Sequence, residues 1–435
     1  FTQWREPTVL GVPRMARETA ERNIETIAGK DAPKVLEFMI KPIRANDTAR
    51  VKFVNNLRAE TKETVVNKLG IRARSNEDAL VMRYGEGRIT LDELKKTTPK
   101  WEAVQKSAEF FREKYDKLLD MVNRERSRFG YDPIPKRKDY FRHFQEVGGF
   151  IDNFGLLFRA EDLPADIAGL TRFFRPGKPF STAELRRMGT KTVESAIDGF
   201  DNYLDSISRQ IYHIDSVQRI RALEKYIRNA KDAGQANLPT TARNLLEYGS
   251  LVSGKASAID RGVEDYLLGR GAFKLIDWLK RRTGANMILT NVAAALTNFI
   301  PFTASLATTQ KASFVKGLLK TAASPLEKYP HAIDGIESSF LTRKFPIKTI
   351  DPTKLKKAEE FAGWLFNKVD SFVARSIVAG KYYEGLKRGL KPLDAMDAAD
   401  TYAGKIMADR SIGGLPNLMN TRTLGPITQF QTEIN

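Results

Sequence analysis

The densest group of side chains suited to chemistry in this chain is a mixture of cations and aromatic rings between Lys136 and Phe144. The stretch reads KRKDYFRHF. Lysine and arginine neutralise phosphate groups and aromatic rings stack on unpaired bases, so this mixture suits a nucleic acid. The candidate contacts are Lys136, Arg137, Lys138, Tyr140 and Arg142. The competing and simpler interpretation is that the rings anchor the segment in the protein core while the cations face water.

No pattern typical of an enzyme or a metal site accompanies this stretch. The chain has no cysteine, which excludes disulfides, thiol catalysis and zinc–thiolate sites. The sequence also lacks a phosphate-binding loop, HExxH, GxSxG and a calcium loop. The three histidines, which show no metal-ligand spacing, are His143, His213 and His331. We therefore predict no enzymatic activity within these residues, no cofactor and no small-molecule substrate. A carboxylate pair brought together only by folding is the remaining alternative.

The overall charge points to an acidic partner. Lysine and arginine outnumber aspartate and glutamate by 71 to 53, which gives a formal net charge of +18. Such an excess attracts nucleic acid or an anionic membrane surface, although charge also keeps proteins soluble. We expect any binding of DNA to be non-specific.

A run of 28 residues without a charged side chain occupies positions 283–310. Cations flank it, at 280–282 on one side and at Lys311 and Lys316 on the other. The run is long enough to cross a bilayer, which takes about 20 helical residues. Repeated Asn and Thr residues and Pro301 interrupt it, so we predict a helical hairpin with a break near Pro301, either buried among helices or inserted in lipid. The candidate membrane- or bundle-contacting residues are Met287, Leu289, Val292, Leu296, Phe299, Ile300 and Phe302.

Hydrophobic residues recur at helical spacing almost throughout the chain. We therefore predict an all-α protein, an extended multi-helix assembly with two long helices, an irregular connector rich in Pro, Gly and aromatic residues, and the apolar hairpin. The two long helices are expected at 192–233 and 352–389, with a last helix at 392–410. Within the first 130 residues the longest helix is expected at 101–129, where Gly130 would end it. Capping-box patterns occur at 90–93 and 181–184, and Asp351 before Pro352 predicts another helix start.

Two apolar patterns predict how the long helices pack. One helix carries a single stripe, made of Phe200, Tyr203, Ile207, Ile211 and Ile214. The other carries a short heptad seam, made of Leu355, Ala358, Ala362, Leu365, Val369 and Phe372. A seam of little more than two heptads is typical of helix-on-helix packing within a fold or between copies.

Composition divides the chain into six regions. They are an amino-terminal helical region (1–130), the irregular connector (131–190), a long-helix region (191–282), the uncharged hairpin (283–310), a carboxyl-terminal helical region (311–411) and an extended tail (412–435). The chain begins at Phe1 without an initiator Met, so we expect a fragment of a longer polypeptide.

The carboxyl-terminal residues resemble a known family. DTYAGKIMADRS at 400–411, LPNL at 415–418 and LGPITQFQTEIN at 424–435 are similar to the conserved end of large polyvalent phage proteins. The motif residues that we single out are Leu415, Pro416, Gly425, Pro426, Gln429 and Phe430. Residues 140–143 resemble a second signature of the family, with Arg142 in place of its Pro, and 285–301 resembles the family's apolar segment. The resemblance covers about 130–435 and leaves the first 130 residues unassigned.

This resemblance implies a protein carried in a virion. We expect an internal virion protein that is packed with the genome, ejected into the host, and helps to form or support a DNA-translocation conduit in the cell envelope. Its expected partners are genomic DNA, other copies of itself, other virion proteins and the host membrane. Its expected location is the virion interior and then the host cell envelope. The alternatives are a scaffold module that carries separate effector domains, and an accessory region of a virion-carried polymerase or nuclease.

Overall fold

The structure, a computed structural model, describes residues 28–134, 194–229, 300–323, 331–347, 349–351 and 364–407, with single positions between 8 and 25, between 245 and 253, and at 414. Within the well-placed part of the chain, 80% of residues are helical and 2% lie in strands, which confirms the predicted all-α class. The connector beyond residue 134 and the tail beyond 414 lie outside the described residues, as does the capping-box pattern at 181–184.

The described helices, in chain order, are η1 (Gly29–Asp31), α3 (Ala32–Val35), η2 (Leu36–Ile40), α4 (Lys41–Thr61), η3 (Lys62–Lys68), α5 (Asn76–Gly85), α6 (Leu91–Thr97), α7 (Trp101–Arg128), α10 (Ala196–Asn229), α15 (Ile300–Thr308), α16 (Lys311–Ala323), α17 (Ser339–Lys344), α19 (Trp364–Lys387) and α20 (Pro392–Ile406). Two antiparallel pairs of two-residue strands complete the list: β1 (Thr8–Val9) with β2 (Val12–Pro13), and β3 (Ala332–Ile333) with β4 (Ile336–Glu337).

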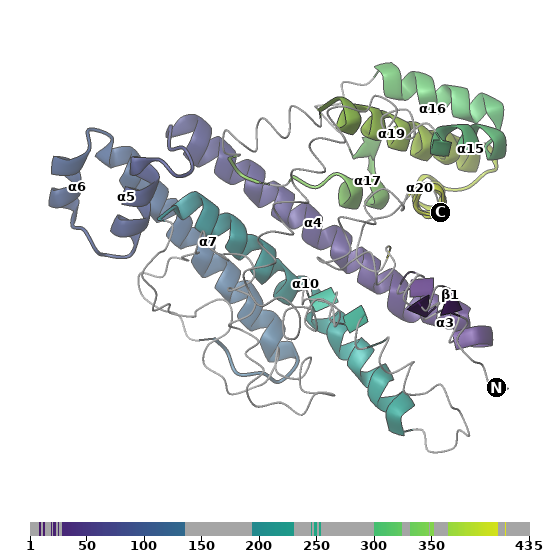
Figure 1. Cartoon of the computed structure of the whole chain (residues 1–435), viewed down its shortest axis with the longest axis horizontal. Helices are drawn as coiled ribbons and strands as arrows, with labels where there is room; N and C mark the ends of the chain where they lie inside the picture. The colour runs from purple at the N-terminus through teal and green to yellow at the C-terminus, as the bar shows by residue number, and fades with distance from the viewer. Residues whose placement is uncertain are drawn as a thin grey trace.

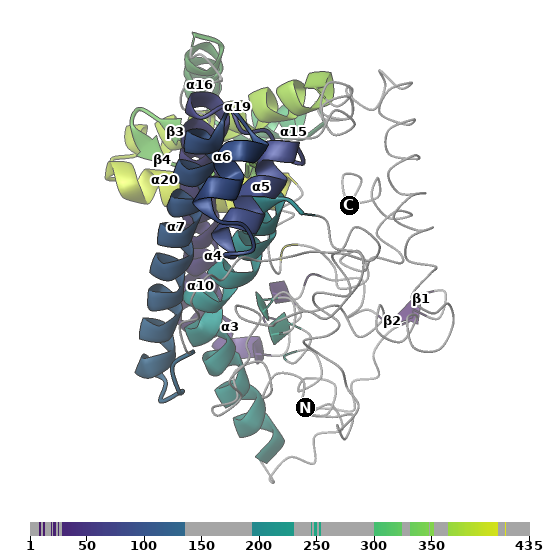
Figure 2. The same ribbon diagram turned by 90° about the vertical axis from the view of Figure 1, so that its left-hand side faces the viewer.

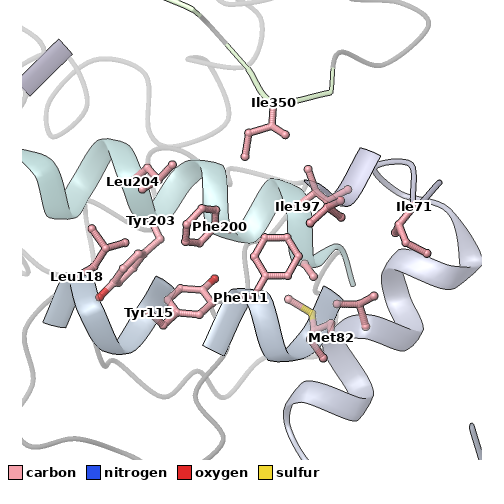
Figure 3. Close-up of a cluster of buried hydrophobic side chains, with 14 of the residues drawn as sticks. Ile71, Met82, Phe111, Tyr115, Leu118, Ile197, Phe200, Tyr203, Leu204 and Ile350 are labelled. Carbon is pink, nitrogen blue, oxygen red and sulfur yellow. The ribbon is translucent and has the colours of Figure 1, made fainter. Parts of the chain in front are cut away.

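The amino-terminal helices form an elongated bundle. The long helix α10 packs against both α4 and α7, and α5 and α6 lie at one end (Figures 1 and 2). The predicted stripe of α10 is buried along its whole length, which confirms that prediction. Its rings interlock with those of α7: the ring centroids of Phe111 and Phe200 are 5.2 Å apart, and those of Tyr115 and Tyr203 are 4.9 Å apart (Figure 3).

Local sequence signals set two helix boundaries in this bundle. At the start of α6, Thr90 Oγ1 accepts a hydrogen bond from the Glu93 backbone N–H, and the Glu93 carboxylate accepts one from the Thr90 backbone N–H. This is the predicted capping box. At the end of α7, Gly130 has φ +70°, a left-handed conformation that glycine adopts without strain. The predicted end of this helix is therefore confirmed to within one residue.

The second hydrophobic core surrounds α19, with α16 on one side and α20 on the other (Figure 1). Val369 of the predicted seam packs against this core, which agrees with helix-on-helix packing. Every residue from 373 to 380 is buried, whereas Val369 and Phe372 of the seam are only half-buried. The reason is that α19 is central and is covered on several faces, which a one-sided pattern does not anticipate. The remaining seam residues have side chains outside the described part, and α20 ends at Ile406, four residues earlier than predicted.

A short segment after α17 joins the two cores. Ile350 inserts into the amino-terminal core (Figure 3). The guanidinium of Arg58 on α4 donates to Asp201 and Asp205 of α10 and to the Ile347 carbonyl oxygen. Asp351, predicted to cap a helix from Pro352, accepts a hydrogen bond from the Ala73 backbone N–H at 3.0 Å. This carboxylate thus binds the amino-terminal bundle, and the residues that follow it lie outside the described part.

Candidate functional site

The structure describes only a small part of the sequence-predicted sites. All five candidate nucleic-acid contacts and all six residues of the carboxyl-terminal family motif lie outside the described residues. Of the apolar candidates, Ile300 begins α15, and Phe302 is half-buried against the second core. The Phe302 ring lies 4.9 Å from that of Phe314, centroid to centroid. The other five apolar candidates lie outside the described part. The candidate site that can be built is therefore the hairpin of α15 and α16.

The helix α15 starts at Ile300, and the break predicted near Pro301 stays a prediction. Pro301 occupies the first turn of α15, where its missing N–H leaves no hydrogen bond unmade. A turn that the sequence does not predict lies at Thr309 and Gln310, between α15 and α16. The observed hairpin therefore joins the end of the uncharged run to a lysine-bearing helix. Whether the chain also breaks before residue 300 lies outside the described residues.

The helix α15 and the turn after it bury two hydroxyl groups, and the helix exposes a leucine. Ser305 and Thr309 are buried, their oxygens are 3.3 Å apart, and both bond with the hydroxyl of Tyr402 on α20. Leu306, by contrast, is 42% exposed. Helices of water-soluble proteins normally have the reverse distribution, with the apolar face inside.

The helix α16 repeats this distribution. Its buried face holds Ser313, Phe314, Gly317 and Thr321, and Gly317 meets α19 backbone to backbone. Its opposite face carries Val315, which is 48% exposed, and Leu319, which is 64% exposed. Three of the four buried residues are small or carry a hydroxyl, as in helices that pack closely in a non-aqueous environment, and the fourth is the bulky Phe314.

A buried carboxylate fixes the turn of the hairpin. Glu384 of α19 accepts hydrogen bonds from the Gln310 backbone N–H and the Lys381 ammonium, both at 3.1 Å, and forms an ion pair with Arg388. Burial alone would raise the pKa of Glu384, but the Gln310 N–H and the two cations outweigh it and hold the pKa below its usual value. An ionised carboxylate thus lies at the start of α16, where the helix dipole favours negative charge.

A second polar cluster is buried between α4 and α10. Asp47 Oδ1 lies 2.9 Å from Arg50 Nε and 3.4 Å from His213 Nε2. Burial lowers the pKa of His213 and lowers that of Arg209 to about 10. Burial opposes ionisation of Asp47, but His213 and Arg50 together hold its pKa well below its usual value. A His–Asp pair can serve as a general base, and here the imidazole is fully buried between the two helices.

Three aspartates with raised pKa values also act in the fold. Burial raises the pKa values of Asp78, Asp201 and Asp400 to about 6. Asp78 accepts a hydrogen bond from the Ser195 hydroxyl at 2.5 Å, and Asp400 accepts one from the Ser338 hydroxyl at the same distance. Each serine also caps the start of a helix, α10 or α17, so Asp78 and Asp400 position helix ends. Asp201 instead accepts a hydrogen bond from Arg58.

Metal centres and membrane-spanning helices are two further kinds of site. Among the described residues, no group of three or more His, Asp or Glu side chains is arranged to hold a metal ion. Nor does any described helix combine the length and apolar composition that crossing a bilayer requires. Most of the uncharged run, residues 283–299, lies outside the described residues.

No family model, no curated protein sequence and no solved structure matches the chain. The resemblance to large polyvalent phage proteins therefore stays an expectation from the sequence, and a functional proposal has to be argued from geometry and charge.

Sequence reasoning missed the polar groups that matter most in this geometry. Glu384 lies between Lys381 and Arg388 at helical spacing, a pattern that normally indicates a solvated surface. Its bond to Gln310 spans 74 positions, and the pair of Asp47 and His213 spans 166. The one sequence signal for the buried pair was the position of His213 between Ile211 and Ile214 of the α10 stripe.

Proposed function

We propose that this chain is a helical virion protein of a phage or related element, which enters the host with the genome and supports a DNA-translocation conduit at the cell envelope. The observation that carries this proposal is the apolar outer surface of the α15–α16 hairpin. Hydroxyls, small residues and Phe314 face the protein, while Leu306, Val315 and Leu319 face outward. Such packing rests on close contact and hydrogen bonds, so it persists where water is absent.

Charge and composition support the same proposal. A net charge of +18 offsets the phosphates of packaged DNA. The absence of cysteine removes any covalent crosslink that would oppose threading through a narrow portal. Helical folds are rich in local contacts, which favours rapid refolding after delivery.

The test measures release of a dye trapped in vesicles of phosphatidylcholine and phosphatidylserine. We expect the wild-type chain to release the dye. The double variant Ala294→Arg with Leu296→Arg should not, because an arginine at the centre of a membrane helix costs about 3 kcal/mol. The matched control is Leu390→Arg with Leu393→Arg, which adds the same charge at two exposed leucines near the α19–α20 turn. A silent wild type, or equal release by the Ala294 and Leu296 variant, would contradict the proposal.

A second candidate function is a scaffold module that carries separate effector domains. The observation in its favour is that Ser305 and Thr309 are hydrogen-bonded to Tyr402 of the same chain, so α15 is already packed within its own fold. A scaffold predicts no dye release and a defined oligomer in solution. Light scattering coupled to size-exclusion chromatography measures the oligomer, and a monomer without dye release would contradict both functions.

A further inference from the structure

We infer that the outer face of α16 is a docking surface for an anionic lipid bilayer, on which the helix lies parallel to the membrane plane. The inference rests on the proposed function and names its partner. It concerns a surface that is already exposed in the folded chain, and it is separate from any insertion of residues 283–299.

The docking surface is an apolar stripe on the side of α16 that faces away from α19. It consists of Ala312, Val315, Leu319 and Ala322, all exposed, at helical spacings of three and four. The buried residues Ser313, Gly317 and Thr321 lie on the opposite side of the helix. Figure 1 shows α16 at the edge of its helical group, with α19 on its inner side. We call these four exposed residues the outer stripe.

Charge complementarity identifies the occupant of this surface. Lys311, Lys316 and Lys320 accompany the outer stripe, and neither α15 nor α16 contains a carboxylate. The carboxylate of Asp334, 3.6 Å from Lys320, offsets one of these charges and leaves a positive excess. The Lys316 ammonium lies 4.2 Å from the centre of the Tyr383 ring of α19. An amphipathic helix with lysines beside an apolar face binds the headgroup region of anionic membranes. Pairing with a second copy would instead bring the lysines of two stripes together, which like-charge repulsion opposes.

The rest of the fold holds the stripe in place. Glu384 anchors the start of α16 through the Gln310 backbone N–H, and Gly317 fits tightly against Gly380 of α19. The helix is thus already ordered, and the conformational entropy of forming it is not lost on binding. The apolar face of such a helix is buried about 5–10 Å into the boundary between headgroups and acyl chains.

The test is flotation of the 435-residue chain with vesicles. One set contains phosphatidylcholine alone and the other phosphatidylcholine with phosphatidylserine. We expect wild type to float with the anionic set. Val315→Glu with Leu319→Glu should weaken binding more than tenfold, because both apolar side chains leave the lipid and two negative charges replace them. The matched control, Leu390→Glu with Leu393→Glu, changes two other exposed leucines and should float like wild type.

A charge series separates electrostatic attraction from apolar burial. Lys311→Gln and Lys320→Gln should each weaken binding to the anionic vesicles roughly fivefold, with no effect on phosphatidylcholine alone. Circular dichroism of every variant should match wild type, because each substituted side chain is exposed.

The outcomes distinguish this inference from the proposed function. Equal flotation of wild type and the Val315 and Leu319 variant contradicts the docking surface, and the conduit is then judged by dye release alone. Flotation that depends on the stripe without dye release supports the docking surface and contradicts the conduit. A variant that changes the oligomeric mass without changing flotation assigns the stripe to a second copy and overturns the inference, as does a wild type that floats with neither set.

Discussion

Gly317 of α16 and Gly380 of α19 meet backbone to backbone: a methyl group added to Gly317 would lie 2.8 Å from the Cα atom of Gly380. Carbon atoms do not approach so closely without a shift of one helix. The contact therefore holds α16 against the central helix of the second core, and it fixes which face of α16 points outward.

The first prediction concerns this contact. Gly317→Ala should destabilise the fold by about 1–3 kcal/mol, because the added methyl forces α16 away from α19. The direction is informative, since alanine in place of a helical glycine normally stabilises a helix by about 1 kcal/mol. Denaturant unfolding followed by circular dichroism measures the change. Gly380→Ala is the graded control, because its methyl would meet Phe314 at 3.1 Å and should be tolerated better. A stabilised Gly317 variant would mean that the helices do not touch here.

The second prediction concerns the joint between the two cores. Arg58→Met should reduce the free energy of unfolding by about 3–5 kcal/mol, because Asp201 would remain buried without its cation. The control is Arg219→Met on α10, whose ion pair with Asp215 is exposed and should contribute at most about 1 kcal/mol. Equal effects of the two substitutions in urea unfolding would show that the Arg58 cluster is not buried in solution.

How much of this fold the sequence predicts depends on the range of the interaction. Local rules predict the capping box at Thr90, the end of α7 at Gly130 and the buried stripe of α10, because each depends on neighbours within a few turns. The central position of α19 is not predictable in this way. Its burial comes from α16 and α20 together, and the largely apolar stretch at 373–380 does not indicate which helices cover it.

The candidate site is even less visible in the sequence. The uncharged run is obvious, but its described end is separated from its partners by long stretches of chain: Thr309 bonds with Tyr402, 93 positions away. The outward direction of Leu319 follows from the tight contact of Gly317 with α19, and no periodicity distinguishes the two faces of α16 by polarity. Tertiary packing therefore decides which of two moderately apolar faces is exposed.

The third prediction is a pH dependence carried by Asp400. Its pKa is about 6 in the folded chain against an ordinary value of 3.8, so the folded state binds the proton more tightly. Its contribution to stability is therefore fully present below pH 3.8 and is lost as the pH rises through 6. Unfolding of wild type and Asp400→Asn should be compared between pH 3 and 8. The difference between the two proteins in the free energy of unfolding should change by about 2–3 kcal/mol as the pH rises from 3.8 through 6, and should stay constant at higher pH.

The control for this comparison is Asp394→Asn, which alters an exposed carboxylate in the first turn of the same helix. This variant keeps Asp400, so the loss of stability as the pH rises through 6 should persist. A flat difference for Asp400→Asn would show that its bonds to Ser338 and Ser339, rather than burial, control this carboxyl group.

The fourth prediction has the opposite sign and concerns His213. Burial holds its pKa below 6.5, so its contribution to stability is present above pH 6.5 and is lost as the pH falls through the folded pKa. His213→Gln keeps an N–H donor for Asp47 but cannot take up a proton. Relative to this variant, wild type should lose up to about 1.4 kcal/mol per pH unit below 6.5. Parallel pH profiles for the two proteins would mean that the imidazole is exposed to water.

The fifth prediction separates a dedicated DNA site from diffuse positive charge. Affinity for double-stranded DNA of any sequence should fall steeply between low and moderate salt, because binding releases counterions in proportion to the phosphates contacted. If Lys136, Arg137 and Lys138 contact DNA directly, replacing all three by Gln should lower the slope of log affinity against log salt by about one for each contact. The matched control replaces three exposed lysines on α6 and α7, namely Lys96, Lys106 and Lys117.

Equal losses for both triple variants would favour charge spread over the whole surface, with the rings near Tyr140 serving the core. A larger loss for the first would assign the basic and aromatic stretch to DNA, and affinity that is indifferent to salt would remove DNA from the proposed function.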